Sequence, residues 1–206
     1  MDDTSSRRAR TNRSRRGPLA PNPQLWKALE RGTKLRKILV DFYAEVYRDE
    51  RLEPFFHATT SEWAIDHQYA FLGAIFSGEP MYFGDRPRNA HHWMVITDEL
   101  FDYREALMER CLRRHGLAQE HIAAWRAVEE VFRRRIVKVE PFARMRNGVA
   151  MPLEGYSTIQ LDAGGFCDRC AAAIERGAQG HYHVRTDKVL RGQCAEEEGI
   201  GVQVSP

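Results

Sequence analysis

The chain has 206 residues, enough for one domain and an appendage, and 43% of them are hydrophobic, so a sizeable core is possible. The mean hydropathy is −0.55, and no apolar run approaches the roughly 20 residues that would cross a bilayer, so no membrane association is expected. The formal charge of +2 is too small to indicate a nucleic-acid partner.

Residues 1–24 hold most of the charge imbalance. They contain six arginines against two aspartates, are rich in Ser, Asn and Pro, and lack apolar periodicity. This composition predicts a disordered basic tail, and a weak arm for an anionic partner is the alternative. No apolar segment follows Arg15-Arg16, so an export signal is not expected and we predict a cytoplasmic protein.

Residues 25–140 are predicted to be almost entirely helical and to form one domain. After a short helix over 25–29, apolar residues from Leu35 to Tyr47 recur at i, i+3, i+4 and i+7. This spacing predicts a helix that ends near Asp49 and buries one face in the core.

A third helix is expected to start after a cap at Thr60 or Ser61 and to end at Gly78, where helix-breaking residues gather. Its inward face would carry Ala64, His67, Gln68, Phe71, Leu72 and Ile75. Beyond it we expect a loop with a short helix over 81–93, a long helix from Thr97 or Asp98 to Gly116, and another from about Gln119 to Val139.

The pattern changes after Pro141, where glycines become frequent. We expect a linker over residues 141–155 and a small β-rich module over residues 156–206. Such a module lacks an adequate core, so it needs a metal ion or docking onto the helical domain. Alternating residues predict strands over 156–161, 182–186 and 201–204.

Several short motifs in the helical region occur in a distinctive order. They are Asp41-Phe42-Tyr43, Leu52-Glu-Pro-Phe-Phe56, His67-Gln68 with Phe71-Leu72, Ser77-Gly-Glu-Pro80 with Tyr82 and Gly84, Ala90-His91, and Ile96-Thr97 with Phe101-Asp102. In their joint order and spacing, residues 25–139 resemble a truncated haemoglobin, the short bacterial globin. The resemblance implies a mainly α fold, a two-over-two helical sandwich, with the β-rich module appended.

The resemblance implies haem b, with its iron held by a histidine. The spacing within the family places this histidine at His91, five residues before Ile96, and a neutral imidazole is the axial ligand that globins use. His92 is the rival. On a helix it would point about 100° away, so the two cannot both face the iron.

Tyr43 matches the position of the family's distal tyrosine, and Gln68 that of its partner glutamine. A phenol O–H or an amide N–H stabilises a polarised diatomic ligand such as O2. Gln68 also lies on an otherwise apolar stripe, where an unpaired amide would be costly. That cost is an independent reason to expect a pocket at this place.

The resemblance also implies apolar walls and a polar edge for the haem. Arg88 and Arg86 would pair with the propionates or remain solvated loop charges. Arg104 would lean outward or reach a propionate. The walls would be formed by Phe56, Phe71, Leu72, Tyr82, Ile96 and Phe101.

Cysteines in the β-rich module have the spacing of a metal site. Cys167-Asp-Arg-Cys170 is a CxxC knuckle, and Arg191-Gly-Gln-Cys194 has the frame of a second one with arginine in the first position. The module thus resembles a degenerate zinc ribbon, in which His183 or His181 would complete a Cys3His site for Zn2+. A site without metal and a redox dithiol at Cys167 and Cys170 are the alternatives.

The resemblance implies a haem protein that binds O2, NO or CO, for oxygen binding or transport or for nitric oxide detoxification. The latter, a nitric oxide dioxygenase-type activity, needs an external reductase, because no flavin or nicotinamide motif is visible in the chain. The alternative is a gas or redox sensor or adaptor whose zinc-ribbon-like module contacts a partner. A globin fold that serves only as a scaffold without haem is a third hypothesis.

Overall fold

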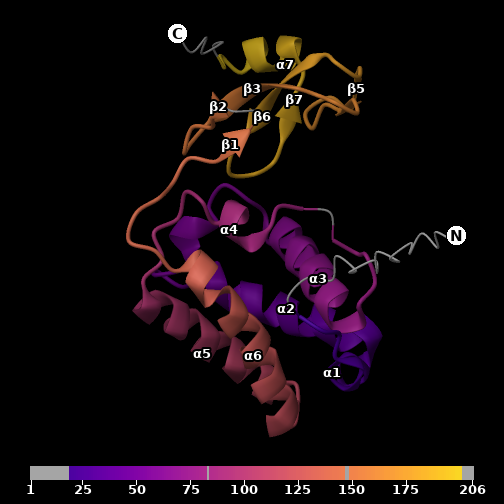
Figure 1. Ribbon diagram of the computed structural model, residues 1–206, viewed down its shortest axis with the longest axis vertical. Helices are drawn as coiled ribbons and strands as arrows, with labels where there is room; N and C mark the ends of the chain where they lie inside the picture. Colours follow the sequence, from indigo (N-terminus) through magenta and orange to yellow (C-terminus); the bar gives the residue numbers. More distant parts are fainter. Residues whose placement is uncertain (1–18, 83, 147–148, 201–206) are drawn as a thin grey trace, which may run out of the picture.

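The computed structural model describes residues 19–82, 84–146 and 149–200 (Figure 1). The strand predicted over 201–204 and most of the predicted tail lie outside these residues. The end of that tail belongs to the fold, because Asn22 caps the first helix and its backbone N–H bonds to the Phe76 carbonyl over 3.1 Å.

Helices occupy the first two thirds of the chain, as predicted, and short strands follow (Figure 1). Helix α2 (Thr33–Val46) packs against α3 (Ser61–Ser77) and α5 (Asp98–Arg114), and α5 packs against α6 (Gln119–Ile136). Within the described residues, no helix combines the length and the apolarity needed to cross a membrane. The helices are α1 (Pro23–Ala28), α2 (Thr33–Val46), α3 (Ser61–Ser77), α4 (Pro87–Ala90), α5 (Asp98–Arg114) and α6 (Gln119–Ile136), with 3-10 turns at Glu30–Gly32 and Glu53–Phe55.

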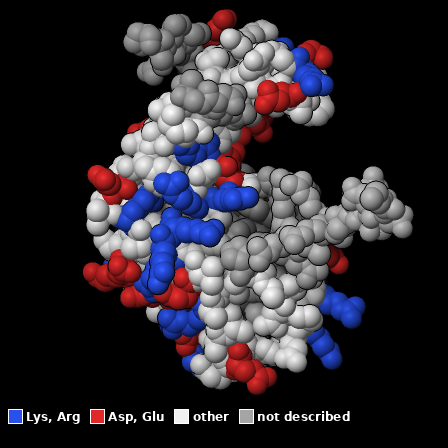
Figure 2. Space-filling model, viewed as in Figure 1, with Lys and Arg blue, Asp and Glu red and all other residues white. Residues whose placement is uncertain are grey.

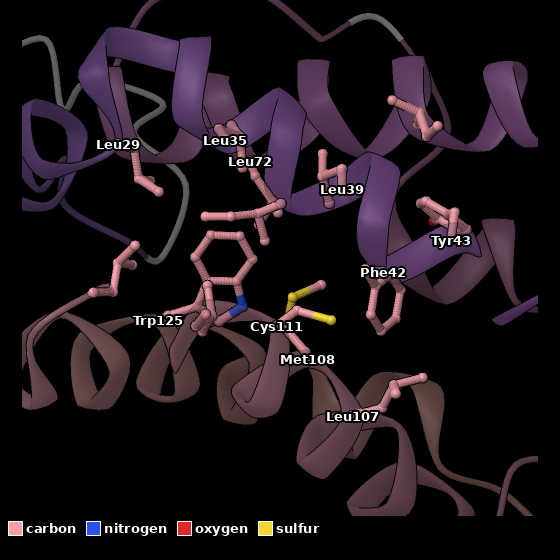
Figure 3. Close-up of a cluster of buried hydrophobic side chains, with 14 of the residues drawn as sticks. Leu29, Leu35, Leu39, Phe42, Tyr43, Leu72, Leu107, Met108, Cys111 and Trp125 are labelled. Atoms are coloured by element: carbon pink, nitrogen blue, oxygen red, sulfur yellow. The ribbon is translucent and has the colours of Figure 1, made fainter. Parts of the chain in front are cut away.

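The helical core lies between α2 and α3 on one side and α5 and α6 on the other (Figure 3). Leu35, Ile38, Leu39 and Phe42 follow the predicted helical spacing, and all four are buried. The indole of Trp125 packs against the Phe76 ring, with the ring centroids 5.3 Å apart. This apolar centre holds the helices that carry the candidate site in fixed positions.

Local signals set the helix ends. The hydroxyl of Thr60 accepts the Trp63 N–H at the start of α3, over 3.2 Å. Gly78 ends α3 with φ +80°, a backbone conformation that glycine adopts without strain. The hydroxyl of Thr97 accepts the Leu100 N–H at the start of α5, also over 3.2 Å.

Replacing Thr97 with alanine is expected to lower the free energy of unfolding by about 1 kcal/mol, because the cap on the first turn of α5 is lost. Thr97→Ser keeps the hydroxyl and should retain most of that stability. Denaturant unfolding followed by circular dichroism measures both variants. Equal stability of the alanine variant and the unmodified protein would contradict the capping role.

The module after α6 contains three small antiparallel sheets within the described residues. Its central sheet has the strand order β3-β6-β7, with Tyr156 opposite His183 and Gln160 opposite Gln179. The cysteines lie at the turn between β4 and β5 and on the last helix. The elements are β1 (Met145–Arg146), β2 (Val149–Ala150), β3 (Tyr156–Gln160), β4 (Gly165–Phe166), β5 (Ala173–Ile174), β6 (Gln179–His183), β7 (Val189–Leu190) and α7 (Gly192–Glu197).

The stretch 141–155, predicted to be a linker, contains the paired strands β1 and β2. One strand prediction for the module is corrected. The strand expected over 182–186 begins earlier, at Gln179, and ends at His183. Pairing with β3 sets these limits, and the chain then turns, with the Asp187 N–H bonded to the His183 carbonyl over 3.0 Å.

Candidate functional site

The segment around His91 is held against the end of α6. Pro87 is the first residue of α4, where its missing N–H costs nothing, and His91 caps the end of this short helix. Ile96 and Lys138 form a two-bond antiparallel bridge with N–O distances of 3.2 and 2.9 Å. Lys138 Nζ also donates to the His91 carbonyl over 2.6 Å. These bonds fix the place of His91 relative to the long helices.

His91 is a neutral imidazole with one ring nitrogen already bonded. Its Nδ1 lies 2.7 Å from the Pro87 carbonyl oxygen. Because a carbonyl only accepts, the proton is on Nδ1 and the lone pair is on Nε2. Burial lowers the pKa of His91 to about 4, although the bond to Pro87 acts in the opposite direction. Metal-binding histidines share this arrangement, with the second nitrogen donating to a backbone carbonyl.

His92 lies in different surroundings. Its side chain is buried, Nδ1 is 2.8 Å from the Asn89 carbonyl, and the ring centroid is 6.3 Å from that of Phe142. It is not among the residues that line the cavity next to His91. The two histidines therefore face different parts of the molecule.

Two polar side chains from other helices lie on the same cavity. The Tyr43 hydroxyl, on α2, donates to Gln68 Oε1, on α3, over 2.7 Å. Burial raises the pKa of Tyr43 far above its ordinary value, so the phenol keeps its proton. Since Oε1 accepts from the phenol, the Gln68 amide N–H groups are the donors left for a ligand.

The cavity has a volume of about 290 Å³ and is mostly apolar. Arg88, predicted to contact haem, is not part of its lining. It is exposed, and its guanidinium carbon lies 4.2 Å from the Phe142 ring centroid. The other predicted contact residues all line the cavity: Tyr43, Phe56, Gln68, Phe71, Leu72, Tyr82, His91, Ile96 and Phe101.

An ion pair forms part of the cavity wall. Arg104 lines the cavity and does not lean outward, and its guanidinium bonds to the carboxylate of Glu129 and lies 4.9 Å from the Phe42 ring centroid. Sequence reasoning missed Glu129. Its position on the apolar stripe of α6, between Trp125 and Phe132, is the signal that could have found it.

The three late cysteines come together, as their spacing predicted. The sulfur atoms of Cys167, Cys170 and Cys194 all lie within 4.8 Å of one another. Arg191 occupies the first position of the second knuckle, and its Nε lies 3.5 Å from Cys194 Sγ. Three thiols at this distance form a possible metal site, with a guanidinium where a fourth cysteine would stand.

The Cys167 thiol has a pKa below that of an ordinary cysteine. Burial raises its pKa, but backbone N–H groups of Arg191, Cys170 and Arg169 outweigh that effect and bring the pKa down to about 7. The Arg191 N–H lies 3.5 Å from Cys167 Sγ. A thiol that ionises so readily is suited to binding a cation.

Neither histidine expected as the fourth ligand belongs to the cysteine group among the described residues. The His183 ring packs edge-on against the Tyr156 ring, at a centroid distance of 4.8 Å, and its Nδ1 accepts the Arg185 N–H over 3.3 Å. His181 is buried on the same strand. The group that the structure brings together among the described residues is therefore the three cysteines, and a histidine as fourth ligand stays a prediction.

A family model described as bacterial-like globin matches residues 25–137, more than half of the chain. The chain belongs to the bacterial-like globin family. The resemblance to a truncated haemoglobin is thus confirmed for the helical domain of this globin. The match ends at residue 137, directly after α6, so the β-rich module lies outside the matched region.

Solved structures agree with the family. The ferric truncated haemoglobin from Tetrahymena pyriformis is 24% identical with a TM-score of 0.52, over 55% of this chain and 97% of that chain. The 2/2 haemoglobin from Synechococcus sp. PCC 7002, in the cyanomet state with covalently attached haem, is 25% identical with a TM-score of 0.50, over 54% and 94%. At 24% identity, the Tetrahymena pyriformis structure supports the fold alone. No curated protein gives a significant match.

The residues present fit a haem, the group expected in this family. His91 offers an unprotonated Nε2 in an apolar cavity, which is the donor that haem iron takes in globins. The indole Nε1 of Trp93 is buried in the cavity wall without an acceptor among the described residues. A buried donor of this kind is satisfied when a polar group arrives.

Proposed function

We propose that this globin binds haem b through His91 and uses it to bind diatomic gases, namely O2, NO or CO. The geometry of His91 is the observation that carries the proposal. Its Nδ1 donates to the Pro87 carbonyl over 2.7 Å, so Nε2 is left as a ligand on the cavity. When bound there, haem supplies an iron centre that coordinates small gases.

The rest of the cavity provides an apolar wall, a fixed His91 ring and hydrogen-bond donors, which a haem-bound gas requires. The aromatic walls exclude water, with the Tyr43 ring edge-on to Phe56 at a centroid distance of 5.6 Å. The Pro87 carbonyl orients the His91 ring, and the ring stays neutral because burial disfavours its charged form. Tyr43 and Gln68 hold each other in place and offer hydrogen-bond donors inside the apolar space.

Tyr43→Phe is expected to speed O2 dissociation about 5- to 30-fold, because it removes the buried hydrogen bond, worth roughly 1–2 kcal/mol, that orients the Gln68 amide toward the ligand. Tyr47→Phe is the matched control. Its hydroxyl bonds to the Thr59 carbonyl over 3.0 Å, and Tyr47 does not line the cavity. Stopped-flow absorbance measures both rates. If O2 dissociates equally fast from Tyr43→Phe and from the control, Tyr43 does not stabilise the bound ligand.

Optical spectroscopy tests the proposed function directly. The full chain, reconstituted with haem, should show a Soret band that shifts between the ferric, ferrous and CO-bound states. If adding haem to the protein produces no sharp Soret band of bound haem, or if an unfolded control retains as much haem, only the scaffold hypothesis remains. Metal content measured on the same sample gives the haem-to-chain ratio.

We propose two physiological uses of the haem, oxygen binding or transport and nitric oxide detoxification. Oxygen binding or transport requires only reversible association. Nitric oxide detoxification also requires an external reductase as partner. Consumption of NO by the oxygenated protein, measured with and without an added electron donor, distinguishes repeated turnover from a single event.

We also propose that the three cysteines bind Zn2+ as a structural site. Cys167, with its pKa lowered to about 7, and Cys194 are buried, whereas Cys170 is exposed. Arg191 lies where a fourth thiolate would complete a zinc ribbon, so an outside ligand or water would take the fourth position.

A sensor or adaptor is the second candidate function, with the β-rich module reporting on the pocket. The observation in its favour is that Arg185 and Asp187 of this module line the haem cavity. Hydrogen exchange of the module with and without CO on the haem tests it. Identical exchange in both states would argue for a module that does not sense the ligand.

A further inference from the structure

The β-rich module forms part of the wall of the haem cavity. Arg185 and Asp187, which follow β6, line it together with residues of the globin helices. A neighbouring cavity of about 600 Å³ lies at the junction of the two parts and shares His67, Tyr82, Asp85 and Asp187 with the first. Figure 2 shows a recess between the module, at the top, and the globin domain below it. The two cavities therefore adjoin each other at the junction of the globin domain and the module.

A polar network holds the module at this place. Arg144 pairs with Asp85 of the globin domain and donates to the Tyr182 hydroxyl over 2.8 Å. Tyr182 in turn donates to the Asp187 carboxylate. The Arg144 guanidinium carbon also lies 5.4 Å from the Tyr182 ring centroid. The module is thus fixed against the loop before α4, on which His91 depends.

Arg185 is positioned by both parts of the protein. Its guanidinium carbon lies 4.3 Å from the ring centroid of Trp93, a residue of the globin domain that also lines the cavity. Its Nε donates to the Leu153 carbonyl over 3.2 Å. The Arg185 side chain is only 17% exposed, so these contacts hold a cation at the cavity edge at low mobility.

The charges around the cavity mouth leave Arg185 able to take an anion. Asp85 is paired with Arg144, and Asp187 accepts from Tyr182. The partner of Arg185 is Glu154, whose side chain is 74% exposed, and such a pair is weak because water screens it. A buried carboxylate would compete with it effectively.

Trp93 supplies a second reason to expect a carboxylate. Its Nε1 is buried without an acceptor among the described residues, beside the guanidinium that stacks on its ring. A buried unpaired donor costs free energy, and an oxygen of the same carboxylate would remove that cost. A cation and an N–H donor at one cavity edge form a carboxylate-binding corner.

We propose that Arg185, carried by the β-rich module, binds a propionate carboxylate of the haem, with the Trp93 indole N–H as second donor. The module thereby completes the haem site that the globin helices build. This inference rests on the proposed function. It concerns a part of the chain beyond residue 137, where the match to the globin family ends.

The test compares Arg185→Gln with Arg176→Gln in the full chain. Arg176 is an exposed arginine of the same module and lines neither cavity. Loss of haem to an excess of a haem-scavenging apoglobin should be about 5- to 30-fold faster for Arg185→Gln, as expected for the loss of a charge-assisted hydrogen bond. Arg176→Gln should lose haem at the unmodified rate. Circular dichroism establishes that both variants fold.

Iron-free porphyrins provide a readout that does not depend on His91. The unmodified protein should bind protoporphyrin IX about 5- to 30-fold more tightly than its dimethyl ester, which lacks the carboxylates, and Arg185→Gln should lose this preference. Fluorescence titration measures both affinities. A Soret band that disappears in His91→Ala, together with no effect of Arg185→Gln on either readout, would overturn the propionate contact and leave the haem function intact. Absence of any haem or porphyrin binding would overturn both.

Discussion

Alanine at position 91 is expected to abolish the Soret band of the reconstituted protein and to weaken haem binding at least a thousandfold. The imidazole is the axial ligand in the proposed site, and alanine supplies no other donor. The His92 ring cannot substitute, because it lies outside the cavity lining and packs toward the Phe142 ring. Titration with haem, followed by absorbance, measures the loss.

Two further variants separate ligation from folding. His92→Ala removes a neighbouring imidazole and should leave the haem spectrum unchanged, whatever it does to stability. His91→Gly leaves a space that added imidazole can fill, so the spectrum should return as imidazole is raised. A spectrum that persists in His91→Ala, or that vanishes in His92→Ala while the protein stays folded, would assign the iron to a different residue.

Removal of zinc is expected to unfold the β-rich module and to leave the globin domain folded. The apolar core around the cysteines is small, and two of its five buried members, Cys167 and Cys194, are themselves proposed zinc ligands. Structural zinc contributes about 10–16 kcal/mol in zinc-finger peptides, which exceeds what so small a core provides. Elemental analysis should give about one zinc per chain, and a chelator or Cys167→Ser should make the module sensitive to protease.

The matched control is Cys111→Ser, which changes a cysteine of the helical core and leaves the cluster alone. Arg191→Cys should act in the opposite sense, because it supplies the missing fourth thiolate and should raise zinc affinity. Protein purified without chelator that contains no zinc, with Cys167→Ser as resistant to protease as the control, would favour a site without metal. A disulfide formed on mild oxidation would favour the redox alternative.

Helix positions could be predicted because their signals are local. The caps at Thr60 and Thr97 and the stop at Gly78 lie within a few residues of the ends they define. The apolar stripe of α2 likewise identifies its buried face without knowledge of its neighbours. Strand limits were less accurate: β6 begins at Gln179 because it pairs with β3, and that pairing has no local signal.

Residues of the candidate sites could be predicted where the family resemblance gave them a position or where their spacing matched a known motif. His91, Tyr43 and Gln68 line one cavity, and three cysteines meet in one cluster. The Arg88 guanidinium lies over the Phe142 ring, a contact that no local signal indicates. The histidines of β6 likewise stand outside the cysteine group among the described residues, and no local signal indicates that either.

The sequence by itself determined a helical globin domain with a histidine, a tyrosine and a glutamine at the family's haem positions, and a cysteine-bearing module after it. The helices follow from periodicity and capping and the cysteine knuckle from its spacing, which depend on near neighbours along the chain, whereas the haem positions are what the family resemblance implies. Only the tertiary structure decided that His91 faces the cavity, that Glu129 neutralises Arg104, and that Arg185 of the module lines the cavity. Such contacts join residues far apart in the chain, so they exist only after the helices and the module have packed together.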